Sequence, residues 1–302
     1  MRVPLLSGSP QRKAWIALVV TAALWAGQSI AAKAVVTYVP PATLSFIRWS
    51  ITLAVVLPFA FAEVRRERAS IQANWRILLL LGLMSTSLQN TIFYWGVYYS
   101  TATNAALLNS TIPIWILVIS SLFFGRRSSH GEWAGVFVSL VGVLCIVMGG
   151  SRSATGGYTF NPGDLIMASA LVNWSLYSVL VPRRPLHLSS WTFVTIVSAI
   201  GVVAILPVYG VELALGWDFT VNTQVVAGML YMAIIGSIFT TITYNYAIDK
   251  LGAAKASFGT HLVPVCGMLL AFVFLGETPT WFALGGFALV MTGIFVGQTA
   301  RR

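Results

Sequence analysis

Charged side chains are scarce in this sequence, and acidic ones are scarcer still. Asp, Glu, Lys and Arg make up 9% of the 302 residues, whereas hydrophobic residues make up 57%. Because a soluble domain is about one quarter charged, this composition excludes a soluble globular protein and indicates an integral membrane protein. The chain has room for roughly ten membrane-spanning helices, at ~20 apolar residues per helix plus short loops.

Cysteine and mid-membrane carboxylates are also nearly missing. Cys145 and Cys266 both lie inside apolar segments, where we expect small core side chains rather than a disulfide. No carboxylate or second metal-binding side chain lies at ligand spacing from His261, so we expect no metal and no cofactor. None of the eight acidic residues lies at the centre of an apolar segment. Proton- and sodium-coupled carriers usually bury a carboxylate there, so a coupling site is not visible and facilitated diffusion stays open.

The apolar segments predict an all-α polytopic protein without a separate soluble domain. Helices are expected because an open sheet edge cannot face lipid. We also expect no cleavable signal peptide, because the run from Ala14 is long enough to span the membrane. The ten predicted spans are residues 14–36, 43–62, 75–98, 103–124, 131–149, 164–182, 190–209, 224–247, 253–275 and 280–298.

The net charge of +10 has a distribution that argues against nucleic-acid binding. Of the 18 Lys and Arg residues, all except Lys33, Arg48 and Arg152 fall in short segments on the side of the membrane that holds the N-terminus. Basic loops stay in the cytoplasm. Both termini are therefore predicted to be cytoplasmic.

The two halves of the sequence carry the same prolines and glycines. Four pairs are each separated by 151 residues: Pro113 and Pro264, Gly125 and Gly276, Gly135 and Gly286, and Gly142 and Gly293. A repeat of five spans must enter the membrane from opposite sides in its two copies. Residues 1–150 and 151–302 are therefore expected to form two inverted repeats, which are typical of alternating-access carriers with a site near the membrane midplane.

Polar and aromatic side chains recur at mid-depth in both halves. Many are spaced three or four residues apart, which places each set on one helical face. Trp25, Trp95, Trp115 and Trp174 also lie deeper than an interfacial aromatic belt. For each residue the alternative is a hydrogen bond between neighbouring helices, but recurrence in both halves favours a cavity. The residues expected to line it and bind substrate are Trp25, Gln28, Asn90, Tyr94, Asn109, Trp174, Tyr177, Tyr244 and His261.

Three side chains leave alternatives open. His261 is either a substrate contact or proton relay, or a neutral side chain bonded to a neighbouring helix. Lys33 and Arg48 lie inside spans near the outer end. Each either extends its charge to the interface or presents it to a carboxylate. We favour the interface for Lys33 and leave Arg48 open.

Prolines and glycines predict different roles for different helices. Pro113 and Pro264 each lack a backbone donor and clash with the preceding turn, so we expect bends there that let the two helices close alternately as gates. The fifth and tenth predicted helices carry spaced glycines and few polar residues at mid-depth. We interpret them as packing elements, because small residues let helix backbones approach closely in lipid.

Together these features resemble a known family. Trp25 in the first helix, Arg48 in the second, the Asn104–Pro113 and Lys255–Pro264 segments and the pair Gly276-Glu277 look like the EamA-type transporters of the drug/metabolite transporter superfamily. Among them the chain is most similar to the YddG-type exporters of aromatic and other amino acids. The first half departs from the pattern, with Gly125-Arg126 in place of Gly-Glu, which argues against a chemical role for the Glu. The resemblance implies a bacterial inner membrane.

The expected function is export of small amphipathic metabolites by alternating access, with amino acids, aromatic ones included, as first candidates. An exporter of drugs or other metabolites is the alternative within the superfamily. A membrane enzyme would need paired carboxylates, a nucleophile–base pair or a metal cluster, and we find none in the sequence. A scaffold would not need a polar midplane in both halves. The expected partners are a small solute and the lipid bilayer; the oligomeric state is not predicted.

Overall fold

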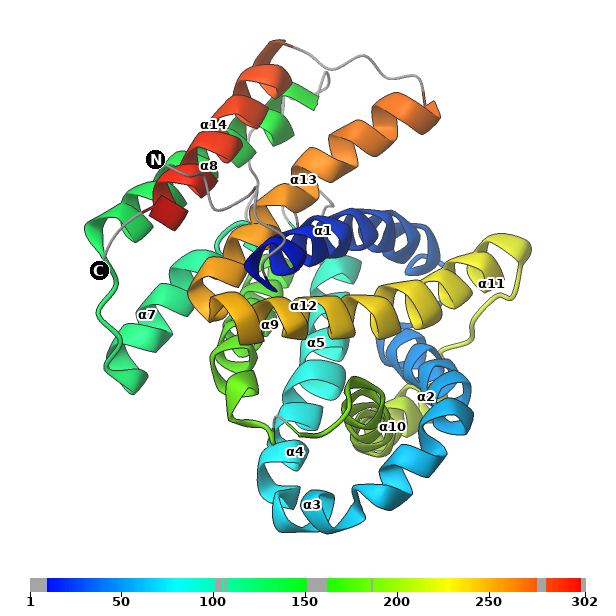
Figure 1. Ribbon diagram of the computed structural model, residues 1–302. Coiled ribbons are helices and arrows are strands. Elements are labelled where there is room, and N and C mark those ends of the chain that lie inside the picture. The colour runs from blue at the N-terminus through cyan, green and yellow to red at the C-terminus, as the bar shows by residue number, and fades with distance from the viewer. Residues whose placement is uncertain are drawn as a thin grey trace.

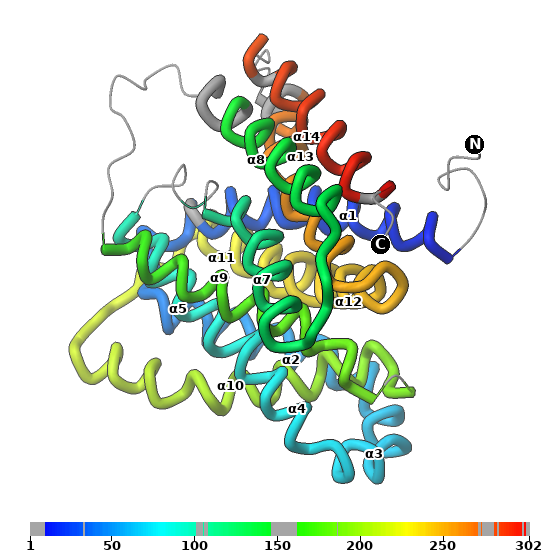
Figure 2. The backbone as a smooth tube through the Cα atoms, turned by 90° about the vertical axis from the view of Figure 1, so that its left-hand side faces the viewer, coloured from blue at the N-terminus to red at the C-terminus, as the bar shows by residue number. Residues whose placement is uncertain are grey.

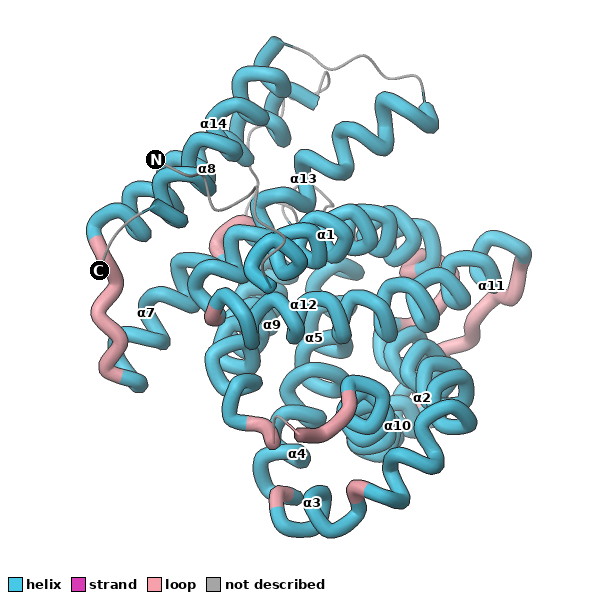
Figure 3. The backbone as a smooth tube through the Cα atoms, in the orientation of Figure 1, coloured by secondary structure: helices cyan, strands magenta, loops and turns pink. Residues whose placement is uncertain are grey.

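The computed structural model describes residues 10–100, 105, 108–150, 162–185, 187–275 and 281–299, and every regular element in these ranges is helical (Figures 1 and 3). The first half contains α1 (Pro10–Val35), α2 (Pro41–Arg66), α3 (Arg68–Ala73), α4 (Trp75–Gly82), α5 (Gln89–Tyr99), α7 (Ile112–Phe124) and α8 (His130–Gly150). The second half contains α9 (Pro162–Leu180), a short 3-10 turn (Val181–Arg183), α10 (Ser190–Ala214), α11 (Thr223–Leu230), α12 (Thr240–Leu251), α13 (Ala253–Leu275) and α14 (Trp281–Thr299).

Six helical segments are long and apolar enough to cross a membrane: Pro10–Ala32, Pro41–Arg66, Trp75–Tyr99, Pro162–Arg183, Ser190–Ala214 and Thr223–Leu251. Shorter apolar helices cover Ile112–Phe124, His130–Cys145 and Leu284–Gly297. The chain is therefore an all-helical, multi-pass membrane protein. The count of ten spans and the cytoplasmic position of both termini stay predictions.

Contacts between the halves come in matching pairs. α1 packs against α12 and α13, whereas α9, the first helix of the second half, packs against α5 and α7 (Figure 1). With an offset of 151 residues, α12 corresponds to α5 and α13 to α7. The contacts therefore repeat as two copies related by a two-fold axis would require.

Two helices change their winding at matching places. Residues Leu83–Leu88, between α4 and α5, and residues Tyr231–Phe239, between α11 and α12, are π-helical. When shifted by 151 residues, the first segment falls within the second. A π-turn bonds five residues back rather than four, so it rotates the side chains that follow, and such turns are frequent at functional sites.

α2 and α10 lie antiparallel and are joined by carboxylates at both ends. Glu212, expected in a loop beyond residue 209, instead belongs to the last turn of α10 and is 2% exposed. Its carboxylate accepts hydrogen bonds from the backbone N–H groups of Ala42 (2.9 Å) and Thr43 (2.7 Å). At this first turn of α2 the N–H groups lack helical partners, and negative charge is favoured. At the opposite end, the Glu63 carboxylate accepts a hydrogen bond from the hydroxyl of Ser189, which caps α10.

α8 and α14 pack along their glycines, as the sequence predicted. The two helices lie side by side, at the edge of the molecule (Figures 1 and 2). A Cβ added at Gly142 would lie 2.6 Å from the carbonyl oxygen of Gly286, and one at Gly135 would lie 2.6 Å from that of Gly293. Gly135 meets Gly293 and Gly142 meets Gly286, so the residue numbers run in opposite directions and the helices are antiparallel. Only glycine permits this approach of the backbones.

Candidate functional site

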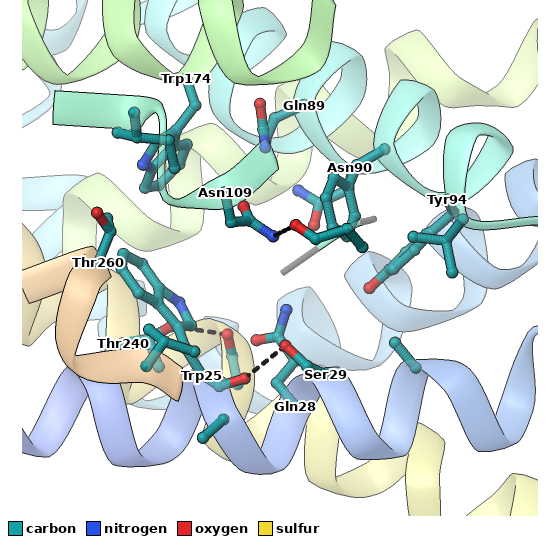
Figure 4. A pocket seen from close by; sticks show the side chains of 18 of the residues that line it. Trp25, Gln28, Ser29, Gln89, Asn90, Tyr94, Asn109, Trp174, Thr240 and Thr260 are labelled. Atoms are coloured by element: carbon teal, nitrogen blue, oxygen red, sulfur yellow. Dashed lines mark hydrogen bonds between the residues drawn. The ribbon is translucent and has the colours of Figure 1, made fainter. Parts of the chain in front are cut away.

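A cavity of about 330 Å³ lies between the two halves. Its walls come from α1, α2, α5, α9, α10, α12 and α13, from both π-helical segments, and from the start of α7 and the residues that precede it (Figure 4). Clefts that hold small ligands have volumes of ~300–1,000 Å³, mostly apolar walls and a few placed polar groups. This cavity fits the lower end of that range, which suits a solute of amino-acid size.

The structure brings most of the predicted site residues together. The predicted residues that line the cavity are Trp25, Gln28, Asn90, Tyr94, Asn109, Trp174 and Tyr177. Figure 4 shows Trp25 and Trp174 toward one end and Tyr94 toward the other. The cavity therefore has a large aromatic surface at one end and polar groups at the other.

Tyr244 does not line the cavity. It is 1% exposed and lies behind the two tryptophans, with its ring 5.0 Å from that of Trp25 and 5.5 Å from that of Trp174. Its hydroxyl lies 3.2 Å from that of Ser178. Trp174 also stacks on Tyr177 at 4.9 Å. Tyr244 therefore supports the aromatic end of the cavity from behind, because Trp25 and Trp174 occupy the space in front of it.

His261 is also placed off the cavity, in the core between helices. The side chain is fully buried: Nε2 donates a hydrogen bond to the carbonyl of Ser110 at 2.8 Å, and Nδ1 lies 2.6 Å from the hydroxyl of Ser139. Both ring nitrogens are thus engaged by protein groups. Ser110 and His261 are themselves 151 residues apart, so this bond joins corresponding positions of the two halves. The helix-bonded alternative is the one that the geometry supports.

The two predicted gating prolines differ in place. Pro113 lies in the first turn of α7, after a turn at Ser110 and Thr111 that interrupts the preceding helical residues. In the first turn of a helix the backbone N–H has no helical partner, so proline is tolerated there without disrupting a hydrogen bond. The helix is therefore interrupted before Pro113, not bent at it. Pro264 lies inside α13 and lines the cavity. Gating by either residue stays a prediction.

Two tryptophans expected at depth are not on the cavity. Trp95 packs against Trp217, with ring centroids 5.4 Å apart, beside the exposed Tyr98 and Tyr99. Trp115 is 36% exposed. Four rings clustered at a helix end are typical of the interfacial belt, so Trp95 belongs there.

Arg48 is the site residue whose role the sequence left open, and it is not at the interface. It is 2% exposed and lines the cavity. Nε donates to the Ser237 hydroxyl at 2.9 Å, and Nη1 donates to Asn90 Oδ1 at 2.9 Å and to the Tyr94 hydroxyl at 2.5 Å. Nη2 donates to the carbonyl of Gly236 at 3.1 Å. These acceptors come from both halves, and all are neutral.

The Gln28 amide completes this cluster. It satisfies both neighbours when its nitrogen donates to the Gly236 carbonyl at 2.7 Å and its oxygen accepts from Nη1 of Arg48 at 3.2 Å. A Cβ at Gly236 would lie 2.5 Å from the Gln28 amide, so the close approach of α1 to the π-helical segment requires glycine there. The sequence signal for this cluster was a basic residue inside an apolar segment; its partners emerge only from helix packing.

Three cavity-lining residues carry a polar atom with no partner in the described part of the chain. The Ser85 hydroxyl, Oε1 of Gln89 and Nε1 of Trp49 are buried without a hydrogen bond. Buried polar atoms are normally paired with protein, water or ligand. These atoms are available to water or to a polar solute.

Several residues of the sequence argument lie outside the described part. They are Asn104, Arg152 and the Gly276-Glu277 pair. For Lys33 the backbone is described but the side chain is not.

Comparison with known proteins identifies the family. The sequence profile of the EamA-like transporter family matches residues 12–148 and, separately, residues 161–297. The chain belongs to this family. Two matches to one profile show that this EamA protein contains two repeats, one on each side of residue 150; the repeat boundary itself stays a prediction.

Relatives of this EamA protein are named as transporters rather than enzymes. An "uncharacterized transporter" of Archaeoglobus fulgidus is 26% identical and covers 94% of this chain and 96% of its own. The "uncharacterized transporter YyaM" of Bacillus subtilis is 25% identical, with 88% and 87% covered. A "probable terminal-alkyne amino-acid exporter" of Streptantibioticus cattleyicolor is 26% identical, with 94% and 93% covered. A solved crystal structure, 21% identical with a TM-score of 0.71, covers 94% of this chain and 96% of that one, so the fold is shared.

Proposed function

We propose that this EamA-family protein exports small amphipathic metabolites from the cytoplasm, with amino acids, aromatic ones included, as the first substrates. The observation that carries the proposal is the cavity itself, which lies between the two repeats and combines tryptophan faces with amides and hydroxyls. Aromatic faces suit an apolar side chain, and the polar cluster suits the charged end of the solute. The relative named as a probable amino-acid exporter supports the same class.

Alternating access is the mechanism that we propose. Matched contacts between the repeats and the antiparallel α8–α14 pair support an inverted arrangement. In carriers built this way, rocking of one repeat against the other exposes a midplane site to each side in turn. The rings of Trp25, Trp174, Tyr177 and Tyr244 pack together at one end of the cavity, and we expect these contacts to separate when the site opens to that side. We place the protein in a bacterial inner membrane with both termini in the cytoplasm.

Counterflow in liposomes tests this proposal. Liposomes that contain the purified protein and are loaded with an unlabelled amino acid should accumulate the same amino acid in labelled form. Phenylalanine, tryptophan and leucine should be among the best substrates in a panel of twenty. Trp174→Ala should reduce the counterflow rate about tenfold, because losing a buried aromatic contact costs ~1–2 kcal/mol of binding. Trp115→Ala is the matched control, because that ring lies off the cavity, and it should retain the wild-type rate.

The alternatives predict other results. An exporter of drugs would show no amino-acid counterflow but would move a lipophilic cation included in the panel. Absence of any flux for every solute, with folded protein in the liposomes, would favour a scaffold and contradict the proposal.

A further inference from the structure

The charge of Arg48 is not balanced by any described carboxylate. Ion pairs in the described residues join Arg126 to Glu132, Arg184 to Asp249 and Arg66 to Glu67, and none includes Arg48. A guanidinium stays protonated in proteins. A charge inside a membrane is costly, and ionisable residues there mark substrate pathways or relays. The acceptors around Arg48 are all neutral, so none of them balances its positive charge.

We propose that Arg48 binds the carboxylate of the transported solute, so that the solutes of this cavity carry a single carboxylate group. The proposal rests on the cavity assigned above to transport and names the group that it recognises. Arg48 is the one charged side chain among the described residues that line this cavity. A solute phosphate would require several basic groups converging on it. One guanidinium suits one carboxylate.

The hydrogen bonds of the cluster leave donors for that carboxylate. When the Gln28 amide faces Gly236, one N–H of Nη2 has no acceptor among the described residues, because Nη2 then donates only to the Gly236 carbonyl. The Tyr94 hydroxyl accepts from Nη1, while its own proton points to the sulfur of Met232 at 3.8 Å. Sulfur is a weak acceptor, so a carboxylate oxygen would take that proton instead. Nη2 and the Tyr94 hydroxyl therefore form a pair of donors for the two oxygens of a carboxylate.

A second part of the wall suits the ammonium of an amino acid. The unpartnered Ser85 hydroxyl and Gln89 Oε1 lie one helical turn apart. Asn90, the next residue after Gln89, accepts from Arg48. Acceptors for an ammonium thus lie on the same helix as the Arg48 partner, and the aromatic end of the cavity remains for the side chain.

Ligand series on the purified wild-type protein test the proposal without transport. Binding is measured by competition against labelled phenylalanine and by ligand-induced thermal stabilisation. Phenylalanine and 3-phenylpropionate, which keep the carboxylate, should bind. Phenethylamine, which lacks it, should bind about 10- to 100-fold more weakly, as the loss of charged hydrogen bonds predicts. If phenethylamine binds as well as phenylalanine, or if no carboxylate probe in a panel of twenty amino acids stabilises the protein, the proposal is wrong.

Variants assign this preference to Arg48. In Arg48→Gln the difference between phenylalanine and phenethylamine should fall to less than threefold, and Arg48→Lys should restore part of it. Arg76→Gln, which removes an exposed arginine beside Trp75, should keep the full difference. An unchanged ratio in folded Arg48→Gln contradicts the proposal; if that variant does not fold, Tyr94→Phe supplies the test, because it removes the second donor and should weaken phenylalanine more than phenethylamine.

These outcomes separate the two proposals. Carboxylate-selective binding without counterflow of any amino acid would leave the Arg48 assignment intact and remove the proposed export activity. Counterflow of amino acids together with equally fast counterflow of phenethylamine would do the opposite.

Discussion

The side chain of His261 links three segments of the chain through hydrogen bonds. Its imidazole bonds to the turn before α7 through Nε2 and contacts Ser139 of α8 through Nδ1. We predict that His261→Ala lowers the thermal midpoint of the detergent-solubilised protein by several degrees, because losing buried hydrogen bonds costs ~1–3 kcal/mol. The Kd for phenylalanine, measured well below the midpoint, should change less than threefold.

His130→Ala, at the exposed start of α8, is the control and should leave the midpoint unchanged. A weakened Kd with an unchanged midpoint would place His261 in the site after all.

The sequence predicted which helical faces are polar, but not which of their side chains reach the cavity and which lie behind other residues. Helical spacing put Asn90 and Tyr94 on one face, and both line the cavity. Tyr244 has the same chemistry at a similar depth, yet two tryptophans stand in front of it. Arg48 has a side chain long enough to reach either the interface or the protein interior, so its position depended on Ser237 and Gly236 of the other half, which no local pattern encodes.

At the scale of elements, the contact between α8 and α14 gives a prediction with an internal control. A Cβ at Gly293 would lie 2.4 Å from the backbone nitrogen of Ser139 and 2.6 Å from the carbonyl oxygen of Gly135. Because backbone atoms cannot yield as a side-chain end can, Gly293→Ala should force the helices apart and destabilise the protein by about 1–3 kcal/mol.

Gly285 is the matched control on the same helix. A Cβ there meets nothing within 4 Å, so Gly285→Ala should be neutral or stabilising by up to ~1 kcal/mol. Urea or thermal unfolding in detergent measures both variants. Equal stability of the two variants would show that α8 and α14 do not pack through these glycines.

Hydropathy predicted the helices well but not their interruptions. The apolar segments are 19–26 residues long in α1, α2, α9, α10 and α14, and each coincides with an expected span. The π-helical segments were missed, because one extra residue in a turn changes neither length nor polarity. At Pro113 a bend was expected, whereas the structure has a turn before the proline, where the Ser110 carbonyl accepts a hydrogen bond from His261.

At the scale of the whole molecule, charges group at the two ends of the helices. Arg184 pairs with Asp249 at one end, close to the junction where Glu63 meets Ser189, whereas Glu212 lies at the other end of α10. We predict that, in a variant lacking Cys145 and Cys266, Val221→Cys reacts with a membrane-impermeant maleimide on intact cells. Ala69→Cys should react only after the membrane is permeabilised. Both positions are exposed, so access alone decides the result, and the reverse pattern would invert the topology and the direction of transport with it.

Arg48 has a neutral counterpart in the other repeat. Pro58 of α2 and Pro207 of α10 occupy matching places, 149 residues apart, and the same offset from Arg48 leads to Val197. Both side chains line the cavity. The two matching walls therefore differ in charge, with an arginine on one and a valine on the other. A solute whose carboxylate binds Arg48 therefore has a single orientation in the cavity. It would keep that orientation relative to the first repeat, which carries Arg48, while the two repeats move.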